Sequence, residues 1–137
     1  MMNSLKIIVA DKHEIFRTRI CGLLNRQECI DIILEVEGEK ELLHLIEKHN
    51  PDIVLIDQDM IADCEHDILH AINKTNKSIK IIVLALHVDV RIVHESIGMG
   101  AFGFLLKKTS YQEVMQAIDT VSQGNVFLCK ESAKILF

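Results

Sequence analysis

The chain has 137 residues, of which 49% are hydrophobic and 26% are charged, values typical of one globular domain that buries its own core. Its formal net charge of -5 at pH 7 argues against direct binding to nucleic acid or to an anionic membrane. No apolar run is long enough to cross a bilayer, no signal-peptide pattern is visible, and the spacing of the four cysteines indicates neither a zinc site nor a disulfide framework. We therefore expect a cytoplasmic domain with reduced cysteines.

Strand and helix patterns alternate along the chain. Apolar runs rich in β-branched residues predict strands over 5–10, 30–36, 51–57, 79–86 and 102–106. Apolar residues at helical spacing predict helices over 13–26, around 42–46, around 68–72, over 89–99 and over 110–124. Such an alternation predicts an α/β fold, a flavodoxin-like (βα)₅ doubly wound parallel sheet with strand order 2-1-3-4-5.

Three charged residues follow predicted strands. Asp11 comes directly after the first strand, Asp57 ends the apolar run of the third, and Lys107 follows the fifth. In the predicted order the first and third strands are neighbours, and the carboxyl ends of parallel strands share one edge of the sheet. We therefore expect the two carboxylates to lie side by side at that edge, with the lysine reaching toward them.

Three motifs at this spacing are carried by residues 9–13 (Val-Ala-Asp-Lys-His), 51–60 (Pro-Asp-Ile-Val-Leu-Ile-Asp-Gln-Asp-Met) and 100–108 (Gly-Ala-Phe-Gly-Phe-Leu-Leu-Lys-Lys). With them, almost the whole chain resembles a response-regulator receiver domain. Receivers are signalling switches of two-component systems rather than enzymes in the ordinary sense. The resemblance implies a sensor histidine kinase as partner and Mg²⁺ as cofactor.

The resemblance also implies a role for individual residues. Asp57 would accept a phosphoryl group from a phosphohistidine of the kinase, and Lys107 would contact that group. Asp11, Asp57 and the main-chain carbonyl of Asp59 would hold the metal. These roles are chemically consistent, because a carboxylate attacks phosphorus only if cations offset the negative charge that develops between the carboxylate and the phosphoryl group.

The end of the chain is similar to the end of receivers in NarL/LuxR-type transcription factors, on residues 124–129 (Gly-Asn-Val-Phe-Leu-Cys) and 133–137 (Ala-Lys-Ile-Leu-Phe). In those proteins a helix-turn-helix DNA-binding domain follows. We expect residues 1–124 to form the receiver and 125–137 to form a tail or the start of a linker to such a domain, which this chain lacks. DNA would be bound only through that domain, and we expect a homodimer formed through outer helices beside the apolar run 126–128.

Several positions depart from the family pattern. Lys12 stands where a second acid is usual, and Ala85 stands where the switch position on the fourth strand is normally Ser or Thr. Phe104 occupies the second switch position, an aromatic on the fifth strand, and has no hydroxyl group. We expect the ammonium of Lys12 to turn inward toward Asp11 or Asp57, degrading the acidic site and weakening Mg²⁺ binding.

These departures leave competing functions. Lys12 and Ala85 favour an atypical receiver that acts as an interaction and dimerisation module, with weak or no dependence on phosphorylation. The alternative is an ordinary Mg²⁺-dependent receiver phosphorylated on Asp57. A third interpretation, a flavodoxin-like cofactor-binding enzyme, is weakened because no Gly-rich phosphate loop follows the first strand.

Overall fold

The computed structural model describes residues 4–63 and 67–137, so Cys64 lies outside the described residues. The strands are β1 (Leu5–Ala10), β2 (Ile30–Val36), β3 (Ile53–Asp57), β4 (Lys80–Ala85), β5 (Gly103–Leu106) and β6 (Phe127–Leu128). The helices are α1 (Glu14–Leu24), α2 (Glu39–His49), α3 (Gln58–Asp63), α4 (Ile68–Thr75), α5 (Val90–Gly98), α6 (Tyr111–Ser122) and α7 (Lys130–Leu136).

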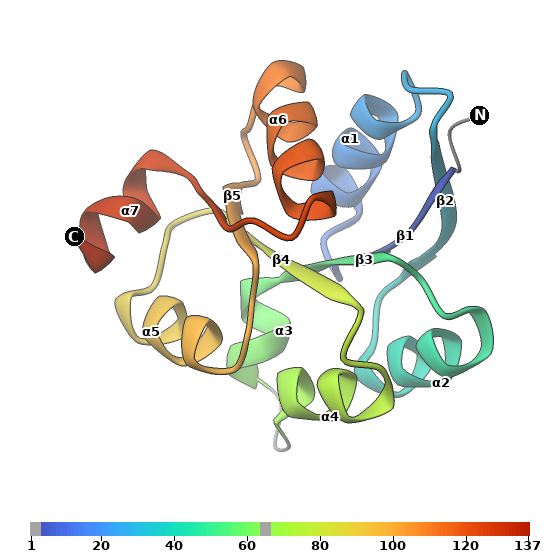
Figure 1. Ribbon diagram of the computed structural model, residues 1–137, viewed down its shortest axis with the longest axis horizontal. Helices are drawn as coiled ribbons and strands as arrows, with labels where there is room; N and C mark the ends of the chain where they lie inside the picture. Colours follow the sequence, from blue (N-terminus) through green and yellow to red (C-terminus); the bar gives the residue numbers. More distant parts are fainter. Residues whose placement is uncertain (1–3, 64–66) are drawn as a thin grey trace.

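The strands form one parallel sheet in the order β2-β1-β3-β4-β5-β6 (Figure 1). The predicted flavodoxin-like fold and the order 2-1-3-4-5 are therefore confirmed. The sheet continues by one strand beyond the prediction, because Phe127 and Leu128 pair with Gly103 and Phe104 of β5. The main-chain N–H of Phe127 donates to the carbonyl of Phe102 at 2.8 Å.

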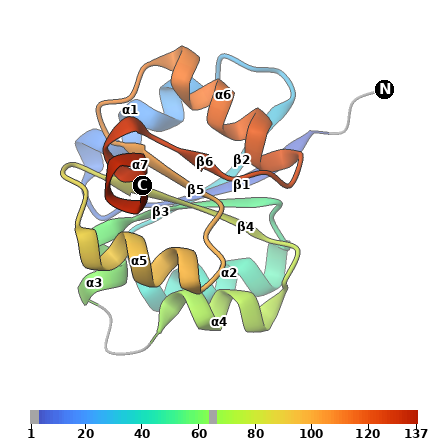
Figure 2. The same cartoon turned by 60° about the vertical axis from the view of Figure 1, so that its left-hand side comes forward.

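Helices cover both faces of the sheet, with α1 and α6 on one face and α2, α3, α4 and α5 on the other (Figure 2). The side chains of neighbouring residues in each central strand point to opposite faces of the sheet, as the two-residue period of a strand requires. On β1, Ile7 and Val9 pack with Ile20 and Leu24 of α1, whereas Ile8 packs in the opposite core. The central strands are thus apolar on both sides, which explains their unbroken apolar runs.

Two segments contain helices or strands that the sequence did not predict. The six residues after β3 form α3, which the sequence did not predict because Met60 and Ile61 do not repeat at helical spacing. Residues 125–137, expected to be a tail or linker, contain β6 and α7. Helix α7 packs against α5, and its residues Ile135 and Leu136 contact the core on that face.

Side chains cap several helices where the sequence changes from loop to helix. The carboxylate of Asp89 accepts from the N–H groups of Arg91 and Ile92 at the start of α5. The hydroxyl of Ser110 accepts from the N–H of Glu113 at 3.1 Å, which is one half of a capping box. The carboxylate of Glu113 accepts from the hydroxyl of Thr109 instead of returning to Ser110.

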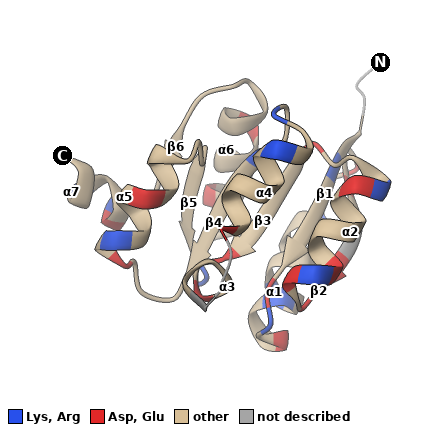
Figure 3. Cartoon of the chain, turned by 90° about the horizontal axis from the view of Figure 1, so that it is seen from below, with Lys and Arg blue, Asp and Glu red and all other residues tan. Residues whose placement is uncertain are grey.

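Charged residues lie on the outer faces of the helices. Helix α2 carries both signs, with Glu39, Glu41 and Lys48 among its residues (Figure 3). In the part of the chain that the structure describes, no helix is both long and apolar enough to span a membrane.

Substitution of Phe104 tests this packing. Its side chain is 1% exposed and lies in the core covered by α2 to α5. We expect Phe104→Ala to lower the free energy of unfolding by about 3–5 kcal/mol, because a large cavity remains where the ring packed. Phe137→Ala is the matched control, since that ring is 97% exposed. Urea denaturation measures both changes, and equal losses in the two variants would contradict the packing.

Candidate functional site

The amino group of Lys107 lies between the carboxylates of Asp11 and Asp57. Its Nζ is 3.0 Å from Asp11 Oδ1, 2.9 Å from Asp11 Oδ2 and 3.1 Å from Asp57 Oδ1. All three residues are buried, with exposures of 0% for Asp11, 1% for Asp57 and 3% for Lys107. Because β1 and β3 are adjacent and parallel, the two acids that follow or end them meet at one edge, as predicted.

Two negative charges share one positive charge in this cluster. Burial, the largest influence, raises the pKa of Asp57, and the nearby carboxylate of Asp11 raises it further. The N–H of Asp59, which donates to Asp57 Oδ1 at 3.1 Å, and the ammonium of Lys107 lower the pKa, but the net shift is upward. Among the described residues, no hydrogen bond reaches the buried Oδ2 of Asp57. Oδ2 of Asp57 can therefore still accept a hydrogen bond or bind a cation.

His13 lies at the mouth of the cluster. Its Nδ1 is 3.1 Å from Lys107 Nζ, 3.3 Å from Asp11 Oδ1 and 3.5 Å from Asp57 Oδ2. Its main-chain N–H also donates to Asp11 Oδ1 at 2.9 Å. The side chain is 40% exposed, so one side of the ring contacts the buried charges and the other faces solvent. No sequence pattern marked His13 as a site residue, although it lies two residues after Asp11.

Two arginines of α1 hold the main chain around the cluster. Arg19 donates to the carbonyls of Lys107 and Thr109 at 3.0 and 2.5 Å. Arg17 donates to the carbonyl of Asp11 at 2.7 Å and forms an ion pair with Glu35. Sequence reasoning missed both, because a basic residue on an amphipathic helix gives no sign of which carbonyl it binds.

Lys12 is the residue expected to bring a second positive charge to the site. Its side chain is exposed, and the buried ammonium between the two carboxylates belongs to Lys107. The buried positive charge between the carboxylates is therefore that of Lys107, and the inward position of the Lys12 ammonium stays a prediction.

Of the remaining predicted positions, Ala85 and Asp59 line a cavity with Asp57, and Phe104 lies on β5. Ala85 and Phe104 are buried, at 2% and 1% exposure, and the side chain of Asp59 is exposed. A cavity of about 190 Å³ beside Asp57 is lined by Gln58, Asp59, Ala85, Leu86 and His87. The amide group of Gln58 donates to the carbonyl of His87 at 2.9 Å.

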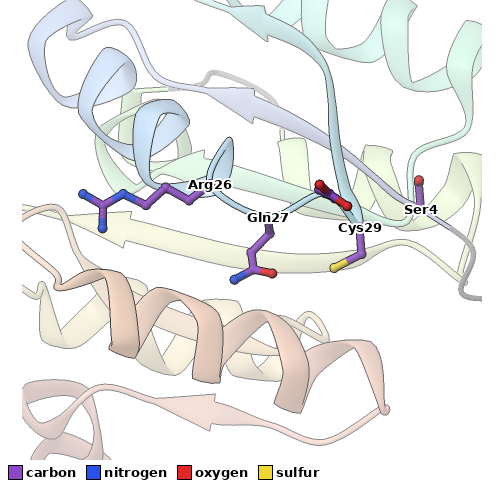
Figure 4. Close-up of a pocket in the computed structure, with 5 residues that line it drawn as sticks. Ser4, Arg26, Gln27 and Cys29 are labelled. Atoms are coloured by element: carbon purple, nitrogen blue, oxygen red, sulfur yellow. The ribbon is translucent and has the colours of Figure 1, made fainter.

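A wider cavity lies at the other edge of the sheet. It has a volume of about 580 Å³ and is lined by Ser4, Arg26, Gln27, Glu28 and Cys29, close to the starts of β1 and β2 (Figure 4). This is the amino edge of the strands, opposite the carboxylates. Its lining offers no group near Asp57, so we assign the chemistry to the carboxyl edge.

The sequence pattern of the response regulator receiver domain matches residues 7–119. The chain belongs to this family. The three residues that the resemblance marked, Asp11, Asp57 and Lys107, are present and in mutual contact. The acidic site of this receiver is therefore intact in these residues, and the expectation of a degenerate site is wrong for them.

Curated relatives extend beyond this receiver. The transcriptional regulatory protein LnrK of Bacillus subtilis is 30% identical over 127 residues, which are 93% of this chain and 58% of LnrK. The transcriptional regulatory protein DegU of Brevibacillus brevis is 26% identical over 126 residues, 92% of this chain and 53% of DegU. The receiver thus spans little more than half the length of these relatives.

Solved structures share the fold. The signal receiver domain of a putative response regulator NarL from Mycobacterium tuberculosis has a TM-score of 0.80 at 24% identity and covers 90% of this chain and 99% of its own. A structure of two RcsB dimers bound to two parallel DNAs has a TM-score of 0.86 at 23% identity, covering 98% of this chain and 68% of its own. At these identities the likeness concerns the fold.

The shared ammonium leads to a prediction about stability. Asp57→Asn is expected to raise the free energy of unfolding of the metal-free protein at pH 7, because the raised pKa of Asp57 means that its charged form is less favourable in the folded chain than in the unfolded chain. The variant leaves Lys107 paired with Asp11 alone. Urea denaturation measures the change, with the exposed Asp31→Asn as control.

The same prediction has a definite dependence on pH. Above the ordinary Asp pKa of about 3.9, the folded wild type binds the Asp57 proton more tightly than the unfolded chain does, so this group's contribution to stability falls as pH rises. The advantage of Asp57→Asn must therefore shrink as the pH falls toward that value, below which Asp57 is protonated in both the folded and the unfolded chain. An advantage that grows on acidification would show that the pKa is shifted downward.

Proposed function

We propose that this chain is the receiver of a NarL-type two-component transcriptional regulator and accepts a phosphoryl group on Asp57 from a sensor histidine kinase. The observation that carries the proposal is the contact of Lys107 Nζ with both Asp57 and Asp11, at 3.1 and 2.9 Å. This places a nucleophilic carboxylate next to a fixed positive charge, which is what phosphoryl transfer to a carboxylate requires.

The residues divide the chemistry between them. A carboxylate oxygen of Asp57 attacks phosphorus, and the bond from phosphorus to the histidine nitrogen of the kinase breaks as the new bond forms. The cavity of about 190 Å³ beside Asp57 provides room for the phosphoryl group. The ammonium of Lys107, already 3.1 Å from Asp57 Oδ1, is positioned to pair with a phosphoryl oxygen.

The cluster fits a divalent cation. Asp11 and Asp57 carry two negative charges against the one positive charge of Lys107, and Asp57 Oδ2 is buried without a hydrogen bond from the described residues. These carboxylates and the main-chain carbonyl of Asp59 would hold Mg²⁺, which supplies charge neutralisation for the transferred phosphoryl group. Binding remains weak in this proposal, since Lys12 replaces the usual third carboxylate.

An atypical receiver is the second candidate, and one observation favours it. Ala85 has no hydroxyl group to bind a phosphoryl oxygen, and Phe104 is already buried at 1% exposure. In receivers, the hydroxyl group at the first switch position connects phosphorylation to an inward movement of the aromatic ring at the second. Without that hydroxyl group, this connection between Asp57 and the Phe104 ring is weakened. We place the phosphoacceptor first because Asp11, Asp57 and Lys107 are all in contact, and an interaction module would need none of them.

The whole regulator extends the proposal. The relatives are named as transcriptional regulators, and this receiver spans 53–58% of their length. We propose that residues 125–137 lead toward a helix-turn-helix domain that binds DNA. The receiver would lie in the cytoplasm and control the dimerisation of that domain. Residues 1–124 would contain the phosphorylation site.

Acetyl phosphate labelling tests the acceptor. We expect Mg²⁺-dependent addition of one phosphoryl group, detected by intact-protein mass spectrometry before the acyl phosphate hydrolyses. Asp57→Asn should abolish the adduct. Asp59→Asn should be labelled like the wild type, because it keeps the main-chain carbonyl and changes only an exposed side chain. Lys12→Asp should label faster at low Mg²⁺, since it returns the third carboxylate.

Two outcomes would favour the atypical receiver instead. One is the absence of any adduct in the wild type at millimolar Mg²⁺ while Lys12→Asp is labelled. The other is labelling at a residue other than Asp57. Ala85→Thr combined with Lys12→Asp then measures how the two positions couple, because both groups address the same phosphoryl group.

Self-association is the second function to test. Ile15 on α1 and Val126 beyond α6 are exposed apolar side chains, at 80% and 52% exposure, on the side where a dimer was expected. We expect reversible dimers in equilibrium sedimentation between micromolar and millimolar protein. Ile15→Glu with Val126→Asp should weaken them, whereas Val90→Asp on α5, exposed by 56%, should not. A strictly monomeric wild type would contradict the proposal.

A further inference from the structure

Lys12 leaves this receiver with two carboxylates where its family usually has three, and the structure brings an imidazole to the same place. Nδ1 of His13, one oxygen of Asp11 and one oxygen of Asp57 all lie within 4.8 Å of one another. We propose that His13 is a metal ligand and that this site takes a divalent transition-metal ion, of the kind that prefers imidazole, through one nitrogen and two carboxylates. The proposal rests on the proposed function only for the location of the site.

The separations between these atoms suit a single ion. His13 Nδ1 is 3.3 Å from Asp11 Oδ1 and 3.5 Å from Asp57 Oδ2. Two atoms bonded to one tetrahedral ion at about 2.0–2.1 Å are themselves about 3.3–3.4 Å apart. The nitrogen therefore stands at a ligand's distance from both carboxylates without any movement of the backbone.

A second observation points to a ligand in the same place. Oδ2 of Asp57 belongs to a side chain that is 1% exposed, faces His13, and accepts no hydrogen bond from the residues that the structure describes. A buried carboxylate oxygen without a hydrogen bond is costly unless a cation or donor binds it. A metal ion between Asp57 and His13 would satisfy this oxygen.

The imidazole is already directed at a cation. Lys107 Nζ lies 3.1 Å from His13 Nδ1, and an ammonium group can only donate a hydrogen bond. Nδ1 therefore directs its lone pair to the inside of the cluster, and an ion bound by Nδ1 would take the place of this hydrogen bond from Lys107. The other side of the ring faces solvent, since the side chain is 40% exposed, and this leaves a path for an ion to enter.

The ligand types decide which ions are preferred. Mg²⁺ prefers oxygen ligands and keeps much of its water, so an imidazole adds little to its binding. Imidazole suits Co²⁺, Ni²⁺ and Zn²⁺. With Lys12 in place of the second acid, and with the imidazole of His13 beside the two remaining carboxylates, the preference of this site moves from the alkaline-earth ion toward transition metals.

The test compares two probe ions, Co²⁺ and Mg²⁺, by calorimetric titration of the unphosphorylated protein. His13→Asn is the informative variant. His13 is the N-cap residue of α1 and makes no side-chain capping bond, and Asn is a favoured residue at this position. The variant should therefore fold at least as well as the wild type. His44→Asn, which changes an exposed histidine of α2, is the control for binding to surface histidines.

We expect Co²⁺ to bind the wild type at one site, and His13→Asn to weaken it by more than about tenfold, the scale on which metal sites respond to lost support. Mg²⁺ affinity should change little in His13→Asn, and His44→Asn should bind both ions like the wild type. In NMR spectra of the histidine rings, Co²⁺ should perturb the His13 signals first. Equal Co²⁺ affinity in His13→Asn and wild type, or first perturbation of another histidine, would overturn the inference.

The outcomes separate this inference from the proposed function. Mg²⁺-dependent labelling of Asp57 together with Co²⁺ binding that ignores His13 would overturn only the transition-metal site. Binding of Co²⁺ through His13 without any labelling of Asp57, with either ion, would overturn only the phosphoacceptor.

Discussion

Both the fold and the acidic site of this protein depend on the contact of one buried ammonium with two buried carboxylates. Placing Asp11 and Asp57 side by side away from water is unfavourable unless a positive charge accompanies them. Lys107 supplies it from the end of β5, and the main-chain carbonyl of Lys107 is in turn held by a hydrogen bond from Arg19 of α1. Strand order, the length of the lysine and the position of α1 must all agree for the cluster to form. The fold and the chemistry are therefore specified by the same contacts.

This arrangement also explains how the receiver can tolerate an unusual residue at its acidic edge. Lys12 is exposed and lies beside a charge balance that Lys107 has already set. The change from acid to lysine alters the ligands available to a cation more than it alters the buried ion pairs. The buried ion pairs depend on Asp11, Asp57 and Lys107 and not on the residue at position 12.

The sequence predicted most of the scaffold and only part of the site. Strand order followed from the alternation of apolar runs and helices, and the meeting of Asp11 with Asp57 followed from that order. The direction of Lys12 did not follow, since a flexible side chain chooses between water and a buried partner by small energy differences. Helix α3 and strand β6 are too short for a periodic signal, at six and two residues.

His13 shows why the remainder was out of reach. As a residue type at the start of a helix it carries no sign of its direction, and its role depends on Asp57, 44 positions away in the sequence (57 − 13). Only the packing of α1 over the sheet brings its Nδ1 within 3.5 Å of that carboxylate. Short-range patterns cannot encode a contact that depends on three strands and a helix together.

The edges of the sheet affect how this protein would aggregate. The most apolar strands, β1, β3 and β4, are all interior, while β2 at one edge exposes Asp31 and Glu35 and β6 at the other has two residues. Charged or very short edges are poor templates for another chain's backbone. Amyloid-like pairing would therefore begin from unfolded chains that expose runs such as 53–56, not from the native surface. Resistance of this protein to aggregation thus depends on its free energy of unfolding, and a substitution that empties the core would lower both.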